Sequence, residues 1–390
     1  MDFEWPPEAE TYRAEIKEWL AKNPRPAPKQ LAEAGYVAPH WPKPYGLDAS
    51  PIQQLVVDQE LKKAGVGRPM NIIGIGWAGP TIIYAGSEEQ KQRYLPKILS
   101  GEEIWCQLFS EPGAGSDLAN LRTKAERDGD EFVINGQKIW TSMAQFSKFG
   151  ILIARTNPDV TKQEGITYFI CPMDTPGIEI RPIIEMTGTH TFNEVFFDDV
   201  RIPAENVVGR VNGGWPLAKV TLGNERVSLS GEGAMWGMGP TARNLIDMIL
   251  SKGGSSDPLL RQEITRLYIE AEVLRLIRLR TISAAVAGKE PGPEASIRKA
   301  MADEHGKHVF ELANRLSGIY GMLNDDDGGR DEQAAYNGML WHHGFLFAPA
   351  LTIGGGTSEV QRNIIGERVL GLPKGPDVET GKTWAEMQQV

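Results

Sequence analysis

Residues 109–142 read "FSEPGAGSDLANLRTKAERDGDEFVINGQKIWTS", and two features of this stretch shape the interpretation of the whole chain. A Pro-Gly-Ala-Gly-Ser turn follows Glu111, and glycines allow backbone N–H groups to approach an anion closely. Asn135-Gly136 separates two strand-like runs, which predicts a β-hairpin. The hairpin leads to Trp140-Thr141-Ser142, an aromatic plane beside hydroxyl donors. Together these features predict a site for a flat, heteroatom-rich ring, although each alone is also typical of a purely structural loop.

The pattern of apolar residues differs on the two sides of this stretch. After it come short β-rich runs separated by Gly, Pro and Asp: "FGILIART", "GITYFICPM", "IEIRPII" and "EVFFDDVRIP". About a hundred residues of this kind predict a compact β-barrel or sandwich. Before it, apolar residues recur at helical spacing in "AETYRAEIKEWLAKN", and Ser50 and Ser87 are predicted helix N-caps.

From Trp215 onward the helical period returns, most clearly in "DPLLRQEITRLYIEAEVLRLIRLRTISAAVAG" and "EASIRKAMADEHGKHVFELANRL". The last predicted helix opens at Thr357/Ser358, with Ser358 and Gln361 spaced as in a capping box. The chain is therefore predicted to be an α+β protein in three parts. These are a helical domain over 1–104, a β domain over 105–212 and a helical bundle over 213–390.

Composition excludes several classes of function. The net charge of −10 over 390 residues argues against nucleic acid as a partner, because phosphate binding needs a surplus of Lys and Arg. The two cysteines and six histidines show no metal-ligand spacing, so no metal is predicted. Residues 69–87 carry no charge, but two prolines and four glycines make them a poor membrane span. With a polar N-terminus unlike a signal peptide, a cytoplasmic protein is expected.

Two common enzyme motifs do not apply to this chain. "GIGWAG" at 74–79 matches GxGxxG, but a dinucleotide fingerprint needs a preceding strand, and the surroundings here are helical. No GxSxG elbow is present, which gives a hydrolase little support.

Taken together, the chain resembles the acyl-CoA dehydrogenase family over essentially its whole length. The resemblance is carried, in the expected order, by "SEPGAGSD", "INGQKIWTS", "EVFFDDVRIPAENVVG" and "GTSEVQRNIIGERVLGLP". It implies an acyl-CoA substrate, FAD as cofactor, a helical–β–helical architecture, a homo- or heterotetramer and an electron-transfer flavoprotein as acceptor.

The resemblance also implies site residues. Trp140 would stack on the flavin edge and the Ser142 hydroxyl would approach its N5. The full set of implied cofactor contacts is Gln107, Phe109, Ser110, Gly115, Ser116, Trp140, Ser142, Thr357 and Glu359. The implied substrate contacts are Ser116, Asn224, Arg226 and Gly355, the last through its backbone N–H to the thioester carbonyl.

The catalytic base departs from the common family pattern. Many relatives carry a Glu immediately before the Gly-Thr of the C-terminal motif, where this chain has Gly355. A smaller set takes the base from the first helix of the C-terminal domain, and by that resemblance the base is Glu225. A Glu–Arg pair on a helix is ordinarily a solvated face, and Glu232, two turns on at about 10 Å, is the competing carboxylate. Losing the usual Glu would widen the acyl pocket for a bulky, branched or steroid-like group.

Two further motifs of homotetrameric relatives are missing, Arg-x-x-Phe-Gly and Gln-x-x-Gly-Gly. Their places hold "GGSSDPLLRQEI" and "SGIYGMLNDDDGG", with Arg261 as a candidate substitute. This pattern resembles bacterial dehydrogenases of steroid side chains, some of which are α2β2 assemblies. Two alternatives therefore stand beside the dehydrogenase: a non-catalytic partner subunit, and a flavin oxidase or monooxygenase of the same fold.

Overall fold

The computed structural model describes residues 7–228, 233–251, 253–286, 292–322, 335–336, 339–376 and 379–388. The chain forms two compact units. The first contains Met1–Ile183, His190–Asn224 and Asp377–Val390, and the second contains Ile184–Thr189 and Glu225–Pro376.

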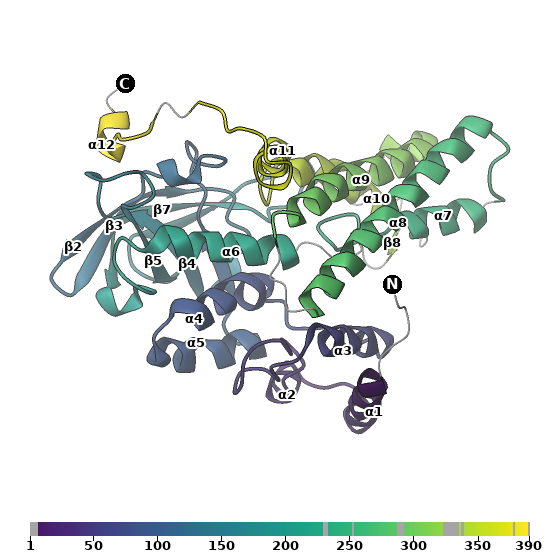
Figure 1. Ribbon diagram of the computed structural model, residues 1–390, viewed down its shortest axis with the longest axis horizontal. Coiled ribbons are helices and arrows are strands. Elements are labelled where there is room, and N and C mark those ends of the chain that lie inside the picture. The colour runs from purple at the N-terminus through teal and green to yellow at the C-terminus, as the bar shows by residue number, and fades with distance from the viewer. Residues whose placement is uncertain are drawn as a thin grey trace. The chain divides into compact units, whose positions relative to one another are not determined.

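The first unit begins with helices, visible as the purple and blue segments of Figure 1. Ser50 and Ser87 are confirmed as N-caps, because each hydroxyl accepts a hydrogen bond from the backbone N–H three residues on. The elements are α1 (Pro7–Lys22), α2 (Pro28–Glu33), α3 (Pro51–Lys63), η1 (Gly74–Ala78), α4 (Gly79–Ala85) and α5 (Glu88–Ser100). The GxGxxG match falls on η1 and the start of α4, so its rejection as a dinucleotide fingerprint is confirmed.

The described residues of this unit also include a seven-stranded sheet. Its order is β1-β4-β2-β3-β7-β6, with β5 also paired to β4, and β1 and β4 run parallel. The strands are β1 (Trp105–Leu108), β2 (Lys124–Asp128), β3 (Glu131–Lys138), β4 (Phe149–Arg155), β5 (Ile166–Pro172), β6 (Ile178–Pro182) and β7 (Asn193–Pro203). Short 3-10 turns η2 (Leu118–Asn120) and η3 (Ala144–Phe146) lie between strands, and η4 (Ala204–Asn206) follows β7.

The hairpin turn predicted at Asn135-Gly136 is wrong. Both residues lie inside the single strand β3, which carries a register shift between Ile134 and Gly136. The chain reverses instead at Gly129-Asp130, between the paired ends of β2 and β3, where Gly129 takes a φ of 62°.

Side-chain contacts explain why Asn135-Gly136 is a bulge and not a turn. The Asn135 side chain donates to the Asp199 carboxylate at 2.9 Å and accepts from the Asp199 N–H at 3.0 Å, which fixes β3 to β7. Gly136 has a φ of 153°, and a Cβ there would lie 2.6 Å from Thr123 Oγ1. The glycine therefore serves close packing at a β-bulge.

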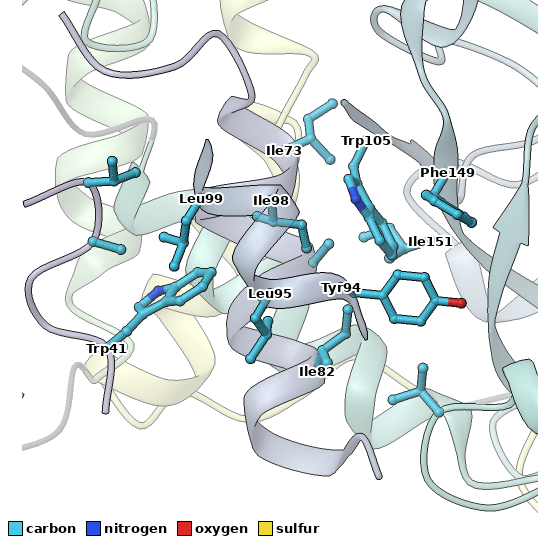
Figure 2. Close-up of a cluster of buried hydrophobic side chains, with 14 of the residues drawn as sticks. Trp41, Ile73, Ile82, Tyr94, Leu95, Ile98, Leu99, Trp105, Phe149 and Ile151 are labelled. Carbon is cyan, nitrogen blue, oxygen red and sulfur yellow. The ribbon is translucent and has the colours of Figure 1, made fainter. Parts of the chain in front are cut away.

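An aromatic and aliphatic cluster joins these helices to the sheet (Figure 2). Tyr94 of α5 makes edge contacts with Trp105 of β1 and Phe149 of β4, at centroid distances of 5.4 and 5.2 Å. Trp41 is buried beside Gly79, where a Cβ would lie 2.2 Å from the indole ring. The helical part and the sheet thus share one core.

The second unit is mainly helical, and α6 (Gly214–Ser228) runs across the division between the units. Its elements after α6 are α7 (Ala242–Ser251), α8 (Pro258–Val286), α9 (Ala295–Leu316), η5 (Gly318–Met322), β8 (Ala335–Tyr336), β9 (Met339–Leu340), α10 (Trp341–Phe347), η7 (Ala348–Thr352), α11 (Ser358–Ile364) and η8 (Ile365–Val369). Its core packs Leu245, Phe310, Trp341 and Leu351 together. His305 of α9 binds Glu270 of α8 at 3.0 Å, which links the two long helices.

The C-terminal segment belongs to the first unit, where α12 (Trp384–Met387) lies against the strands. Trp384 packs its ring against the Arg155 guanidinium at 4.8 Å, and its backbone N–H donates to Val160 O at 2.8 Å. Among the described residues, the helices are all too short or too polar to cross a bilayer.

Candidate active site

The Glu-Pro-Gly-Ala-Gly-Ser loop after β1 is fixed by its first residue. The backbones of Glu111 and Ala114 exchange two hydrogen bonds of 3.0 Å, which closes the turn. The Glu111 carboxylate accepts from the N–H of Arg122 at 2.6 Å, from the N–H of Thr123 at 2.9 Å and from Lys138 Nζ at 2.8 Å. Both ends of the loop are thereby tied to one buried carboxylate.

Lys138, at the end of β3, connects this loop to the segment that carries Trp140. Its side chain is fully buried and also donates to Phe109 O at 2.9 Å. Burial opposes the ionisation of Glu111, but Lys138 and the donors from Thr123 and Arg122 outweigh it and hold the pKa of Glu111 below its ordinary value. Burial lowers the pKa of Lys138, and Glu111 opposes that effect. The pair is a charged anchor between two segments far apart in sequence.

The Trp-Thr-Ser turn lies directly after this anchor. Ile139 N–H donates to Ser110 O at 2.9 Å, which brings the two predicted cofactor motifs together. Thr141 and Asn193 exchange backbone hydrogen bonds of 3.0 and 3.1 Å. Trp140 has a φ of 59°, and its side chain stays 57% exposed with Phe192 at its edge, 6.0 Å between centroids. The turn thus holds a large indole outward from a rigid base.

The residues of this turn fit a flat heterocyclic cofactor. The hydroxyls of Ser110 and Ser142 form no hydrogen bond with any described protein atom, and both residues are half-buried. Two available hydroxyl donors near an exposed indole match the ring nitrogens, carbonyls and π-face of a flavin. FAD is therefore compatible with the donor set at this site.

The other sequence-predicted cofactor residues of the first unit have mixed environments. Phe109 is 2% exposed, with its ring against Tyr168 and its carbonyl bound by Lys138, so it is a core residue of the scaffold. Gln107 is half-buried on β1, while Gly115 and Ser116 are exposed in the loop.

In the second unit, the Gly354-Gly355-Gly356 run has every carbonyl bound. Lys299 Nζ donates to Gly354 O at 2.7 Å, and Gln361 Nε2 donates to Gly355 O and Gly356 O at 3.3 and 3.2 Å. Gly354 N–H donates to Ala350 O at 2.9 Å, whereas the N–H groups of Gly355 and Gly356 have no partner among the described residues.

Glycine is required in this run for two reasons. Gly355 and Gly356 have φ values of 67° and 91°, which disfavour any residue with a Cβ. A Cβ on Gly354 would lie 2.6 Å from the Trp236 ring. The run therefore offers backbone N–H groups and no side chain, and the backbone conformation of Gly355 is unsuited to a Glu.

The helix after the glycine run begins at Thr357/Ser358 as predicted, but its N-terminus is capped differently. Thr357 is the N-cap of α11, because its hydroxyl accepts from Val360 N–H at 3.2 Å. The capping box predicted from Ser358 and Gln361 is wrong, since the Gln361 side chain binds the glycine carbonyls instead. Glu359 is exposed and lies 3.7 Å from Arg362.

Glu225 lies on α6 and the residue is 7% exposed, so it does not belong to a solvated helix face. One helical turn earlier, Thr221 binds Thr81 Oγ1 at 2.8 Å and Tyr168 Oη at 3.0 Å, which anchors α6. Asn224 is half-buried.

The structure gives less information on three other residues that the sequence singled out. Arg226 lies on α6, and the competing carboxylate Glu232 falls outside the described residues. Arg261, the candidate substitute for the missing Arg, is exposed on α8.

Sequence reasoning missed three residues that hold the loops, Lys138, Lys299 and Asp303, and assigned a different role to a fourth, Gln361. One signal was available for Lys138, because it occupies an inward-facing position of an otherwise alternating strand. Lys299 and Asp303 have the i, i+4 spacing of an ordinary surface pair, which gave no indication of burial.

Family models match nearly the whole chain. The N-terminal, middle and C-terminal domain models of the acyl-CoA dehydrogenase family match residues 7–102, 106–200 and 212–370. The chain therefore belongs to the acyl-CoA dehydrogenase family, whose members are oxidoreductases acting on acyl-CoA and are flavoproteins that bind FAD.

Similar curated proteins come from Mycobacterium tuberculosis. The acyl-CoA dehydrogenase IpdE1 is 38% identical over 392 residues, covering 94% of this chain and 98% of IpdE1. The acyl-CoA dehydrogenase FadE34 is 45% identical over 346 residues, covering 88% of this chain but only 46% of FadE34. This chain thus spans about half the length of FadE34.

Two solved structures are also similar. The "Tcur3481-Tcur3483 steroid ACAD" has a TM-score of 0.80 and 31% identity, covering 96% of this chain and 100% of that one. The ChsE4-ChsE5 complex from Mycobacterium tuberculosis has a TM-score of 0.78 and 33% identity, with the same coverage of 96% and 100%. The predicted fold class, α+β with the acyl-CoA dehydrogenase architecture, is confirmed.

Proposed function

We propose that this chain catalyses the α,β-dehydrogenation of an acyl-CoA thioester to a trans-2-enoyl-CoA, with Glu225 as the base. The single observation that carries the assignment is the 7% exposure of Glu225 in a chain with glycine at position 355. An α-proton next to a thioester is weakly acidic, so its removal requires a carboxylate shielded from water. Glu225 takes this proton on a carboxylate oxygen.

In this proposal the glycine run stabilises the negative charge that develops on the thioester. Negative charge develops on the thioester carbonyl as the proton leaves, and a donor aimed at that oxygen lowers the barrier. Gly355 N–H has no partner among the described residues, and its neighbouring carbonyls are already bound. We assign Gly355 N–H as this donor. When bound, FAD supplies the acceptor for the hydride that leaves the β-carbon.

In this proposal the Glu-Pro-Gly loop with its preceding Ser110 and the Trp-Thr-Ser turn both contact the cofactor. Trp140 supplies an aromatic face, and the hydroxyls of Ser110 and Ser142 supply donors to ring acceptors. Gln107, Gly115, Ser116, Thr357 and Glu359 complete the proposed set. Phe109 is left out of it, because its ring is buried against Tyr168 and its carbonyl is bound by Lys138. Ser116, Asn224 and Arg226 are proposed to contact the acyl-CoA.

The substrate class follows from the missing side chain and from the neighbours. Without a Glu at 355, the acyl pocket has room for a bulky, branched or steroid-like group. A solved neighbour at 31% identity is titled a steroid ACAD, which supports this choice. Straight, short acyl chains are expected to be poorer substrates. We also propose a cytoplasmic enzyme that passes electrons to an electron-transfer flavoprotein.

The test of the base is Glu225→Gln, measured as anaerobic flavin bleaching by a panel of straight-chain, branched and steroid-like acyl-CoAs. Because Gln is isosteric but cannot accept the proton, the bleaching rate should fall at least about 10²–10⁴-fold. Bound flavin, read from its absorbance, should be unchanged.

Glu232→Gln is the matched control and should bleach at the wild-type rate. A Glu225→Gln protein that bleaches normally, or a Glu232→Gln protein that does not, removes Glu225 from its role.

A non-catalytic partner subunit is the second candidate. It is favoured by the two similar solved structures, whose names each join two proteins, Tcur3481-Tcur3483 and ChsE4-ChsE5. The missing Arg-x-x-Phe-Gly and Gln-x-x-Gly-Gly stretches also favour it. A purified chain that remains colourless with added FAD, and gains flavin only with a companion subunit, would favour this reading. The flavin oxidase or monooxygenase alternative predicts no bleaching by any acyl-CoA under anaerobic conditions.

A further inference from the structure

We propose that Lys299 of α9 is a positioning residue for the reaction, fixing the glycine run so that Gly355 N–H remains the donor for the thioester carbonyl. The inference rests on the proposed function and extends it to a residue that touches neither substrate nor cofactor. Its basis is a set of contacts that lie entirely within the second unit.

The Lys299 ammonium has three N–H donors, and each has an acceptor. It donates to the Asp303 carboxylate one turn along α9, to Leu351 O at 3.0 Å and to Gly354 O at 2.7 Å. Lys299 is 8% exposed and Asp303 is 3% exposed. Two of the three acceptors are backbone carbonyls at the approach to the glycine run, so the lysine fixes the backbone of that segment.

A tether is needed because this segment is built from glycines. Three consecutive glycines have more conformational freedom than any other tripeptide, so ordering them costs more entropy. Lys299 holds the first glycine carbonyl, and Gln361, which is 1% exposed, holds the next two. With the carbonyls bound, the peptide planes are fixed, and the N–H of Gly355 is fixed with them.

A purely structural role predicts a different pattern of effects. A lysine that only stabilises the unit would lower the fraction of folded enzyme, and the folded molecules would turn over normally. A lysine that holds the donor would slow the chemical step in folded molecules while leaving acyl-CoA binding nearly intact, because a misplacement of about 1 Å can cost about 10²-fold in rate.

The test is Lys299→Met in the FAD-loaded enzyme, including a companion subunit if the flavin requires one. The substitution keeps the length of the side chain and removes all three donors. The maximal rate of anaerobic flavin reduction by acyl-CoA should fall about 10–100-fold with KM changed less than about threefold. Independently of activity, hydrogen exchange at the amides of residues 354–357 should become faster.

His305→Gln is the matched control, because His305 is a buried polar residue of the same helix that binds Glu270 and not the glycine run. It should lower stability, leave the rate per folded molecule unchanged and leave exchange at 354–357 unchanged. A Lys299→Met enzyme with the same rate per folded molecule as His305→Gln would overturn the positioning role. A wild-type enzyme whose flavin no acyl-CoA reduces would instead overturn the proposed function.

Discussion

Two loops carry the proposed chemistry, and each is held by a buried lysine, but the lysines have different partners. Lys138 binds Phe109 O beside the Glu-Pro-Gly loop, and its counter-ion Glu111 accepts two further backbone N–H groups. Lys299 binds the carbonyls of Leu351 and Gly354, the latter the first glycine of the run, and its counter-ion is Asp303 on the same helix. Burial raises the pKa of Asp303 to about 7, whereas the pKa of Glu111 is held below its ordinary value.

The difference follows from secondary structure. Glu111 lies in a loop, where the N–H groups of Arg122 and Thr123 are available to its carboxylate. Asp303 lies inside α9, where backbone N–H groups are already used by the helix, so the lysine four residues earlier has to compensate its charge. The Glu111 carboxylate therefore stays ionised at neutral pH, whereas the Asp303 carboxylate titrates near it.

The largest expected effect is loss of the first anchor. Lys138→Met leaves Glu111 buried without its cation, which should lower the free energy of unfolding by about 3–5 kcal/mol. Lys299→Met should lower the free energy of unfolding by less, because Asp303 can bind a proton near neutral pH and remain uncharged. Urea unfolding at pH 7, followed by tryptophan fluorescence, would measure both values.

The control for this comparison is the double variant Glu111→Gln/Lys138→Met, which removes the buried charge together with its partner. It should recover a large part of the stability lost in Lys138→Met. Equal losses in Lys138→Met and Lys299→Met would contradict the distinction between the two anchors.

A second prediction uses the pH dependence of Asp303. Its pKa rises from 3.8 to about 7 on folding, with burial as the main cause, Glu304 adding to the rise and Lys299 opposing it. The folded protein therefore holds a proton that the unfolded chain releases, and the resulting stability is lost as pH rises from about 4 to about 7. The expected change is on the order of 4 kcal/mol.

Asp303→Asn should remove this pH dependence, because an amide does not titrate. Glu111 acts with the opposite sign: its depressed pKa gives stability that is present above pH 4.5 and lost as pH falls through the folded value. Thermal unfolding from pH 4 to pH 8 would compare the wild type with Asp303→Asn. Unchanged pH dependence in the variant would show that Asp303 keeps an ordinary pKa.

The sequence predicted features that depend on local contacts and failed on those that depend on distant residues. Helix starts at Ser50 and Ser87 were predictable because an N-cap is a local interaction within four residues. The turn at Asn135-Gly136 was predicted wrongly because Asp199, 64 residues away, holds that dipeptide in a bulge. Local patterns do not contain such a contact.

For the candidate site, motif resemblance identified the loops but not their anchors. Family motifs include Glu111 and Lys138, yet nothing in their spacing showed that the two would pair. The i, i+4 pair of Lys299 and Asp303 was indistinguishable from a surface pair, because burial depends on the packing of η7 beside α9. The side chains that bind backbone carbonyls across long sequence separations are the part that required the structure.

The smallest expected effect concerns a third contact near the first loop, which lies at the surface. Lys162 is 2.8 Å from Asp117 and 2.5 Å from Glu379, so it joins the end of the Glu-Pro-Gly loop to the C-terminal segment. Both carboxylates are more than 40% exposed, and solvent weakens such pairs. Glu379→Gln should therefore lower the free energy of unfolding by less than about 1 kcal/mol, and less still in 1 M salt. A loss as large as that of Lys138→Met would mean that the loop depends on its surface contact as much as on its buried anchor.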